Sequence, residues 1–417
     1  MEKFIIQGGK KLEGTVRMSG SKNAALPVMA ASLLTYGKTV LKNIPNLSDI
    51  RTMANLLRVL GAKVYRDGKT LTIDTSSADH FDAPYELVKT MRASVVVMGP
   101  LLARLGRARI SRPGGCTLGL RSLDQHLKGF RALGVKIEEN HGYLESSVNG
   151  LRGNEIYFDE ASVTGTENVV MAAVKAKGKT TLLNAAREPH VVDLLRFLQR
   201  MGAKIEGIGN DLLTIEGVKD LHPVEFTISP DYIEADTFLI AGSITGGDLL
   251  IEGADWNASR LEIAKLHEAG VEITREGRGI RVRSPSRPKH TDIKTLPYPG
   301  FPTDLQPQMT GLLSLAEGTS VIAETMYENR YTHIPELQRM GASLRMEGRN
   351  VIVEGVETLS GARVMASDIR AGAALVLAGL AAEGETHISR IYHIDRGYEN
   401  FDEKLKKLGA EILREEE

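Results

Sequence analysis

The chain has 417 residues, a formal net charge of −1, 42% hydrophobic residues and 25% charged residues. This composition is typical of a globular protein, and the length suits two domains of about 200 residues each. A nearly neutral chain has no bulk attraction for nucleic acid or anionic membranes, so any anion site has to be local. Its single cysteine excludes an internal disulfide and a cysteine-based zinc site and fits a reducing cytoplasm.

No segment is typical of a membrane span or a secretory signal. The longest apolar stretches, 93–103 and 371–382, are shorter than the roughly 20 residues that cross a bilayer. The apolar start at 4–6 is far shorter than a signal core. We therefore expect a cytoplasmic protein whose apolar stretches are buried helices.

A short phrase, an apolar residue followed by glycine and then alanine or valine, recurs six times before a strand-like segment. The glycines are separated by 73, 68, 68, 71 and 68 residues and are Gly61, Gly134, Gly202, Gly270, Gly341 and Gly409. Such a regular period indicates six copies of one supersecondary unit of about 70 residues.

Each copy has the same predicted elements. An apolar helix ends near a glycine, a short strand follows, an amphipathic helix stops at the glycine of the phrase, and a hairpin closes the copy. The clearest hairpin is 63–66 with 70–74 around Asp67-Gly68. The short strands are predicted at 39–41, 108–110, 180–183, 249–251, 319–322 and 386–388.

The two ends of the chain complement each other. The sixth copy ends after 411–413 without its final strand, whereas the strand at Phe4–Gln7 has no copy of its own. We predict that this strand completes the sixth copy. The copies then divide into a domain at 22–229 and a domain at 1–21 plus 230–417, with the break near Ser229–Asp231. The fold class is α/β, and the hairpins exclude a simple Rossmann sheet.

The first helices of the copies differ in charge at their predicted starts. Lys22, Arg92 and Arg370 are cations, while the equivalent positions hold Glu167, Asp236 and Asp304. A cation at a helix N-terminus costs about 0.3–1 kcal/mol unless an anion neutralises it. The side chains either extend into solvent or bind an anion, and their recurrence favours an anion site.

Three arginines near the predicted starts of the second helices extend this pattern. Arg121, Arg330 and Arg396 precede their glycines by 13, 11 and 13 residues. We expect a cleft between two domains lined by about six cations, and arginine suits carboxylate and phosphate. The predicted ligand is a small polyanion. No Walker loop or dinucleotide motif stands at a strand–helix junction.

The only cysteine lies in a glycine-rich loop at 111–121. Gly114, Gly115 and Gly119 surround Cys116, and Arg112 and Arg121 flank it. A free cysteine is most often a buried apolar residue, but a cationic glycine-rich loop favours a reactive thiol. At pH 7 an ordinary thiol is mostly protonated and can donate a proton. The loop is predicted to be a catalytic lid.

A proline-rich segment at 297–307 carries Asp304. This carboxylate either caps the following helix or is a rigidly aimed general base. The ten histidines are scattered and show no metal-binding spacing, so we expect no metal.

These segments together resemble the enolpyruvyl transferases over essentially the full length. The motifs are Ser19–Ala24, Arg112–Cys116, Asn184–Pro189, Gly300–Asp304, Glu328–Arg330 and Asp395–Tyr398. The resemblance implies two inside-out α/β barrel domains, each of three repeated units.

The resemblance also implies a reaction, the transfer of the enolpyruvyl group of phosphoenolpyruvate to the 3′-hydroxyl of UDP-N-acetylglucosamine with release of phosphate. That reaction is the first committed step of peptidoglycan synthesis and uses no cofactor. The implied partners are these two small molecules, with no nucleic acid and no membrane. Two alternatives remain: the relative that acts on shikimate 3-phosphate, and a non-catalytic nucleotide-sugar-binding relative.

Site residues follow from the matching motif positions. Cys116 is implied as general acid or as an aid to product release, and as a site of covalent adducts. Asp304 is implied as the group that orients or deprotonates the sugar hydroxyl, with Lys22 and Arg396 also catalytic. The implied phosphoenolpyruvate ligands are Lys22, Asn23, Arg92, Arg121 and Arg396. The implied UDP-N-acetylglucosamine contacts are Asn23, Arg92, Arg121, Ser122, Leu123, Asp124, Gln125, Glu160, Ala161, Ser162, Val163, Asp304 and Met326. The supporting residues are Glu188, Arg330 and Arg370. Glu160 and Ser122 depart from the family, where some relatives have lysine and many have proline.

Overall fold

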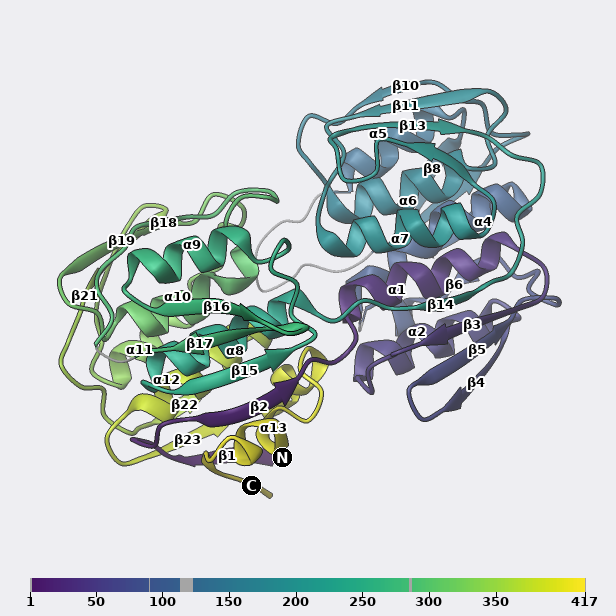
Figure 1. Ribbon diagram of the computed structural model, residues 1–417. Coiled ribbons are helices and arrows are strands. Elements are labelled where there is room, and N and C mark those ends of the chain that lie inside the picture. The colour runs from purple at the N-terminus through teal and green to yellow at the C-terminus, as the bar shows by residue number, and fades with distance from the viewer. Residues whose placement is uncertain (1, 90, 113–122, 285–286, 417) are drawn as a thin grey trace. The chain divides into compact units, whose positions relative to one another are not determined.

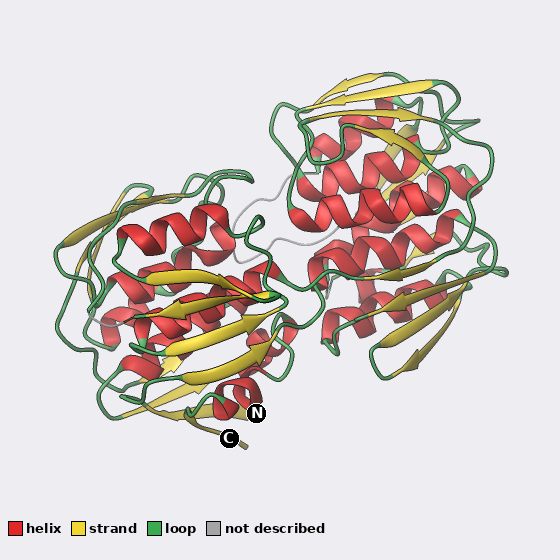
Figure 2. Cartoon of the chain, in the orientation of Figure 1, coloured by secondary structure: helices red, strands yellow, loops and turns green. Residues whose placement is uncertain are grey.

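The structure, a computed structural model, describes residues 2–416 apart from 90, 113–122 and 285–286. The chain folds into two compact units (Figure 1). The middle unit comprises residues 20–112 and 123–229, and the terminal unit comprises 2–19 and 230–416. Within each unit helices gather in the interior and strands lie at the periphery (Figure 2).

The middle unit has three four-stranded sheets of the same design. In each sheet three neighbouring strands are antiparallel, and an outer strand of two or three residues runs parallel to its neighbour. In spatial order the sheets are β14 (Glu225–Thr227), β3 (Lys38–Lys42), β5 (Thr70–Asp74) and β4 (Lys63–Asp67); β6 (Asp82–Ala83), β7 (Arg107–Ser111), β9 (Tyr143–Ser147) and β8 (Lys136–Asn140); and β10 (Glu155–Tyr157), β11 (Lys179–Leu183), β13 (Leu212–Glu216) and β12 (Lys204–Glu206). Since β14 pairs with β3, the last strand of the unit joins the first sheet.

The terminal unit repeats this design three more times. Its sheets are β2 (Glu13–Arg17), β15 (Asp248–Glu252), β17 (Gly279–Arg283) and β16 (Glu272–Glu276); β18 (Ile293–Lys294), β19 (Thr319–Ala323), β21 (Asn350–Glu354) and β20 (Ser343–Glu347); and β22 (Arg363–Met365), β23 (Glu385–Ser389), β1 (Glu2–Gln7) and β24 (Glu411–Glu416). The predicted completion of the sixth copy is confirmed, because β1 lies between β23 and β24 and is antiparallel to both.

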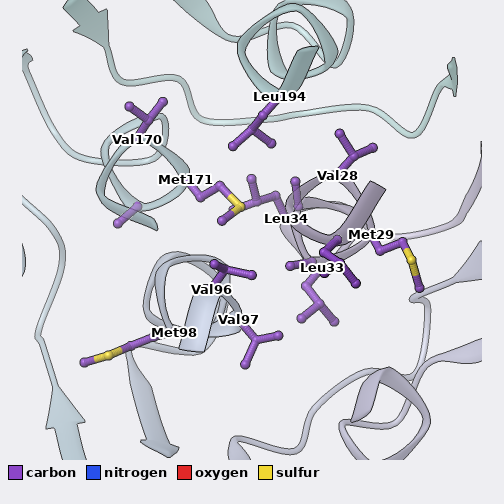
Figure 3. Close-up of a cluster of buried hydrophobic side chains, with 14 of the residues drawn as sticks. Val28, Met29, Leu33, Leu34, Val96, Val97, Met98, Val170, Met171 and Leu194 are labelled. Atoms are coloured by element: carbon purple, nitrogen blue, oxygen red, sulfur yellow. The ribbon is translucent and has the colours of Figure 1, made fainter. Parts of the chain in front are cut away.

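Three helical segments form the interior of each unit and pack against one another. In the middle unit they are α1 (Lys22–Ala31) with η1 (Ser32–Leu34), η2 (Arg92–Val97) continuing into α4 (Met98–Leu105), and α6 (Val163–Ala173). In the terminal unit they are α8 (Tyr232–Ile244), η3 (Thr303–Leu305) continuing into α10 (Gln306–Leu313), and α12 (Ile369–Ala381). Val28, Val96 and Met171 are fully buried where the middle-unit helices meet (Figure 3). Burial of such apolar surface is the main stabilising term.

The remaining helices are amphipathic or short. They are α2 (Ser48–Val59), α3 (Tyr85–Val88), α5 (Asp124–Ala132), α7 (Pro189–Arg200), α9 (Arg260–Glu268), α11 (Ile334–Arg339), η4 (Ile391–Arg396) and α13 (Phe401–Lys407). The second helix of each copy stops at the predicted glycine, and all six glycines have φ between +83° and +106°. This left-handed conformation favours glycine and ends a helix.

Two sequence predictions about helix starts are wrong by about one turn. Helices α6 and α8 start at Val163 and Tyr232, so Glu167 and Asp236 lie in the second turn and are buried. Their caps are Ser162 and Asp231, whose side chains accept backbone N–H bonds. The sequence also did not predict the short outer strand of each sheet. Among the described residues no helix is long and apolar enough to cross a membrane.

Candidate functional site

Lys22 is the first residue of α1, directly after the cap Ser21. Its Nζ lies 3.1 Å from Oδ2 of Asp49, and the two side chains are only 10% and 8% exposed. The ammonium group is therefore not extended into solvent, as one sequence interpretation allowed. Removing either partner would leave a buried charge uncompensated, which is strongly destabilising.

His126, on α5, is buried and lies close enough to Arg92 for the charge of that residue to affect it. Its Nε2 is 3.0 Å from Oγ1 of Thr164, and its Nδ1 is 3.1 Å from the amide nitrogen of Asn168. Burial, and then the charge of Arg92, lower the pKa of His126 to about 3. The ring is therefore neutral at pH 7 and joins the starts of α5 and α6.

Residues implied as nucleotide-sugar contacts lie at these same two helix starts. Gln125 accepts the backbone N–H of Asp159 at 3.2 Å and donates to the Asp159 carboxylate at 3.4 Å. The structure thus brings Leu123–Gln125 close to the segment 160–163, of which Ser162 caps α6. Cys116, Arg121 and Ser122 lie outside the described residues.

Glu188 is the cap residue of α7 but makes no side-chain cap bond. Oε2 of Glu188 and Oε1 of Glu167 are both buried, and neither atom has a hydrogen-bond partner among the described residues. Burial, and then the charge of Glu188, raise the pKa of Glu167 well above its ordinary value. Sequence reasoning missed this facing pair because it placed Glu167 at an exposed helix start.

Asp304 is held by two arginines from different copies of the repeat. Arg330 donates from Nη2 to Oδ1 at 2.6 Å, and Arg370 donates from Nε to Oδ2 at 3.1 Å. The arginine side chains are 2% and 6% exposed, whereas that of Asp304 is 29% exposed. The capping interpretation is wrong, because the cap position of α10 is Leu305 and no side chain bonds there. The carboxylate is an oriented, accessible group.

Arg370 is partnered on several sides. Its guanidinium lies 5.3 Å from the ring centre of Tyr398, whose hydroxyl is 2.9 Å from Oγ1 of Thr237. Burial lowers the pKa of Arg370, but Tyr398, Asp304 and Asp231 outweigh that effect and raise it above its ordinary value. Arg370 therefore binds the carboxylate of Asp304 directly, and this contact explains its charge without a bound anion.

The arginines assigned to the starts of second helices stand slightly earlier in the chain. Arg330 precedes α11 by four residues, and Arg396 is the last residue of η4 before α13. Lys22 and Arg92 belong to the middle unit, whereas Arg330, Arg370 and Arg396 belong to the terminal unit. Among the described residues no group of three histidine, cysteine or acidic side chains has a metal-binding arrangement.

Two buried arginines thus hold an oriented, accessible carboxylate in the terminal unit. The family model for EPSP synthase (3-phosphoshikimate 1-carboxyvinyltransferase) matches residues 6–405. UDP-N-acetylglucosamine 1-carboxyvinyltransferase 2 of Carboxydothermus hydrogenoformans is 54% identical, and UDP-N-acetylglucosamine 1-carboxyvinyltransferase of Trichlorobacter lovleyi is 53% identical, each over 99% of both chains. The chain therefore belongs to the enolpyruvyl (1-carboxyvinyl) transferase family, a family of enzymes.

Solved structures agree with this assignment. The enolpyruvyl transferase NikO of Streptomyces tendae matches with a TM-score of 0.88 and 27% identity over 99% of this chain and 98% of that one. EPSP synthase of Acinetobacter baumannii matches with a TM-score of 0.78 and 18% identity over the whole of both chains. The second likeness concerns the fold alone. The mixed α/β fold with several small sheets is thus that of the enolpyruvyl transferases.

Proposed function

We propose that this enzyme transfers the enolpyruvyl group of phosphoenolpyruvate to the 3′-hydroxyl of UDP-N-acetylglucosamine and releases phosphate. The observation that carries the proposal is identity above 50%, along the full length, to relatives named for that acceptor. The EPSP synthase structure is only 18% identical to this chain in sequence, so that likeness supports the fold and not the choice of acceptor.

The proposal assigns phosphoenolpyruvate to the cationic residues. The four cations Lys22, Arg92, Arg121 and Arg396, together with the amide of Asn23, bind its phosphate and carboxylate. Fixed cations stabilise the charge of a leaving phosphate without reorganisation of water. The buried Lys22–Asp49 pair supports this assignment, because it holds the ammonium group in one place.

The proposed chemistry balances as an addition followed by an elimination. Cys116 gives its proton to the methylene carbon of phosphoenolpyruvate, and the sugar oxygen forms a bond to the adjacent carbon. Asp304 accepts the hydroxyl proton, giving a tetrahedral ketal. The Cys116 thiolate then takes a proton from the new methyl group as phosphate leaves with the electron pair of its C–O bond, which forms the enol ether, and the proton held by Asp304 passes to the released phosphate. Asp304 supports this role because its carboxylate is accessible and oriented by Arg330 and Arg370.

Nucleotide-sugar binding is assigned to Asn23, Arg92, the run Arg121–Gln125, the stretch Glu160–Val163, Asp304 and Met326. The proximity of Gln125 to Asp159 supports two of these segments acting together. We also propose that each unit is an inside-out α/β barrel of three repeats, so that the domains are 22–229 and 1–21 plus 230–417. The common strand order of the six sheets supports this.

A comparison of acceptors tests the function. The protein is incubated with phosphoenolpyruvate and either UDP-N-acetylglucosamine or shikimate 3-phosphate, and phosphate is measured. We expect release only with the nucleotide sugar, together with a product heavier by the enolpyruvyl group. Release only with shikimate 3-phosphate would overturn the proposal. Binding of the nucleotide sugar without turnover would support the non-catalytic alternative.

A further inference from the structure

We propose that Glu324 is a positioning residue for the acceptor side of this site. It connects the turn that carries Asp304 to the turn that carries Met326. The inference rests on the proposed function for its kinetic consequences, whereas its structural consequence is independent of that function.

Glu324 is the first residue after β19 and is 1% exposed. Its Oε1 accepts from Oγ1 of Thr295 at 3.0 Å and from the backbone N–H groups of Met326 at 2.8 Å and Tyr327 at 3.1 Å. Its Oε2 accepts from Oγ1 of Thr303 at 2.9 Å. Four hydrogen bonds to this buried carboxylate fix its position.

The bond to Thr303 reaches the proposed base directly, because Asp304 is the next residue. Arg330 donates from Nε to the carbonyl of Thr303 at 3.1 Å and from Nη2 to Asp304 at 2.6 Å. Thr303 is therefore held on its side chain by Glu324 and on its carbonyl by Arg330. With both contacts in place, the backbone of this turn cannot rotate without breaking a buried hydrogen bond.

The other carboxylate oxygen organises the turn after β19. Tyr331 stabilises the base of this turn, since its hydroxyl accepts from the backbone N–H of Glu324 at 3.0 Å and donates to the carbonyl of Arg349 at 2.8 Å. Burial, followed by smaller effects, raises the pKa of Tyr331 to about 12, so the phenol remains protonated and able to donate. Met326 is thus held through the same carboxylate that holds Thr303.

Two sibling copies have asparagine at the equivalent position. The first residues after β3 and β11 are Asn43 and Asn184, both with φ of +59°. Each donates from its amide to a backbone carbonyl at the end of the neighbouring short strand, Ile228 for Asn43 and Phe158 for Asn184, at 2.9 Å. A structural tie at this position therefore needs only an amide. The copy that contains Asp304 has instead an acceptor that gathers donors from two functional turns.

A double-mutant cycle between Glu324 and Thr303 tests the inference. The variants are Glu324→Ala, Thr303→Val and the combination, and Glu347→Gln, an exposed acid on β20, is the matched control. We expect Thr303→Val to lower kcat about 5- to 10-fold and Glu324→Ala about 10- to 50-fold, since small misplacement of a reacting group is costly. The double variant should be no worse than Glu324→Ala, because both changes break one interaction.

Conservative variants separate positioning from bulk stability. Thr303→Ser and Glu324→Gln retain hydrogen-bonding groups and should recover kcat to within about 3-fold of wild type. Glu324→Ala should also raise KM for UDP-N-acetylglucosamine but leave KM for phosphoenolpyruvate unchanged. A lowered melting temperature with unchanged kcat and KM values would show a merely structural role and overturn the inference, as would additive effects in the cycle.

Hydrogen exchange makes the inference testable without turnover. The amides of Met326 and Tyr327 should exchange at least 10-fold faster in Glu324→Ala than in wild type, while those of β20 remain unchanged. If wild type were inactive with both acceptors, the proposed function would fail but this exchange result would still stand. Unchanged exchange at Met326 and Tyr327 would overturn the positioning role. If Glu324→Ala does not fold, the folded Thr303→Val variant provides the same comparison, through its hydrogen exchange measured by mass and through its kinetics.

Discussion

Individual side chains in this protein are positioned by partners far away in the sequence. Asp304 contacts arginines that follow it by 26 and 66 residues, and Lys22 contacts an aspartate 27 residues further on. Each charge is compensated before any substrate binds. Such preorganised charges suit a reaction in which phosphate leaves, because little reorganisation is needed during the reaction.

Asp304→Asn tests the proposed base at this scale. An amide cannot accept the hydroxyl proton, so kcat should fall about 10²- to 10⁴-fold. Binding of UDP-N-acetylglucosamine, measured by calorimetry, should change far less, because the amide oxygen can still accept from Arg330. Turnover within about 3-fold of wild type would exclude proton transfer to Asp304.

Cys116 has a chemical test that does not depend on its position. If Cys116 is a reactive thiol, as we propose, the epoxide antibiotic fosfomycin should give a single adduct at Cys116 by mass spectrometry and abolish activity. Cys116→Ser should show no adduct and reduced turnover, because a hydroxyl is a much weaker acid than a thiol. Wild-type protein without an adduct would contradict the assignment, and full turnover of Cys116→Ser would remove the acid role.

At the scale of elements, a charged residue in the first two turns of the first helix lies close to one at the start of the second helix in three of the copies. The pair is Lys22–Asp49 in one copy and Glu167–Glu188 in another. In α8 and α9 it is Asp236 and Glu262, which are 0% and 4% exposed. Burial, and then the charge of Glu262, raise the pKa of Asp236, and burial raises the pKa of Glu262 to about 7. Two carboxyl groups in such a site resist ionisation.

Glu262→Gln should therefore change stability in a pH-dependent way. The pKa of Glu262 is higher in the folded than in the unfolded chain, so its contribution is present below pH 4.5 and lost as pH rises through about 7. At pH 8 the variant should be more stable than wild type by an amount on the order of 3 kcal/mol. The difference should vanish near pH 4 in thermal melts.

The exposed Glu272→Gln on β16 is the matched control and should show no such pH dependence. If Glu262→Gln is less stable than wild type at pH 8, the folded protein favours the ionised carboxylate, its pKa is not raised by folding, and the interpretation is wrong.

On the scale of the whole molecule, the terminal unit depends on both ends of the chain. Strand β1 pairs with β23 and β24, and β2 pairs with β15, so residues 2–17 complete two of the three sheets of that unit (Figure 1). Phe4, Ile6 and Leu12 of this segment are fully buried. Among the described strands, none from the first 19 residues belongs to the middle unit.

Deletion of residues 1–19 should therefore unfold the terminal unit selectively. Loss of one central strand and its buried side chains costs several kcal/mol, a large part of the stability of a domain. We expect hydrogen exchange at β15 and β23 to approach the unfolded rate, while β3 and β11 keep their protection. Equal protection of both units in the truncated protein would contradict the prediction.

Sequence periodicity was sufficient to predict the six copies, their short strands and hairpins, and the glycine that ends each second helix. These features depend on local turn chemistry and on which face of an element is apolar. The family motifs likewise lie in short segments, so the class of enzyme could be inferred from them. The starts of α6 and α8 could not, because these helices are buried on nearly every side, polar residues included, and so give no periodic signal.

The sequence by itself therefore determined the repeated elements of this protein and the chemical groups it has available. Only the tertiary structure decided their partners: Arg330 and Arg370 at Asp304, Glu188 opposite Glu167, and Glu324 between Thr303 and Met326. The physical reason is that periodicity specifies which side of an element is buried. Which charged groups then share that buried space depends on how separate copies pack together.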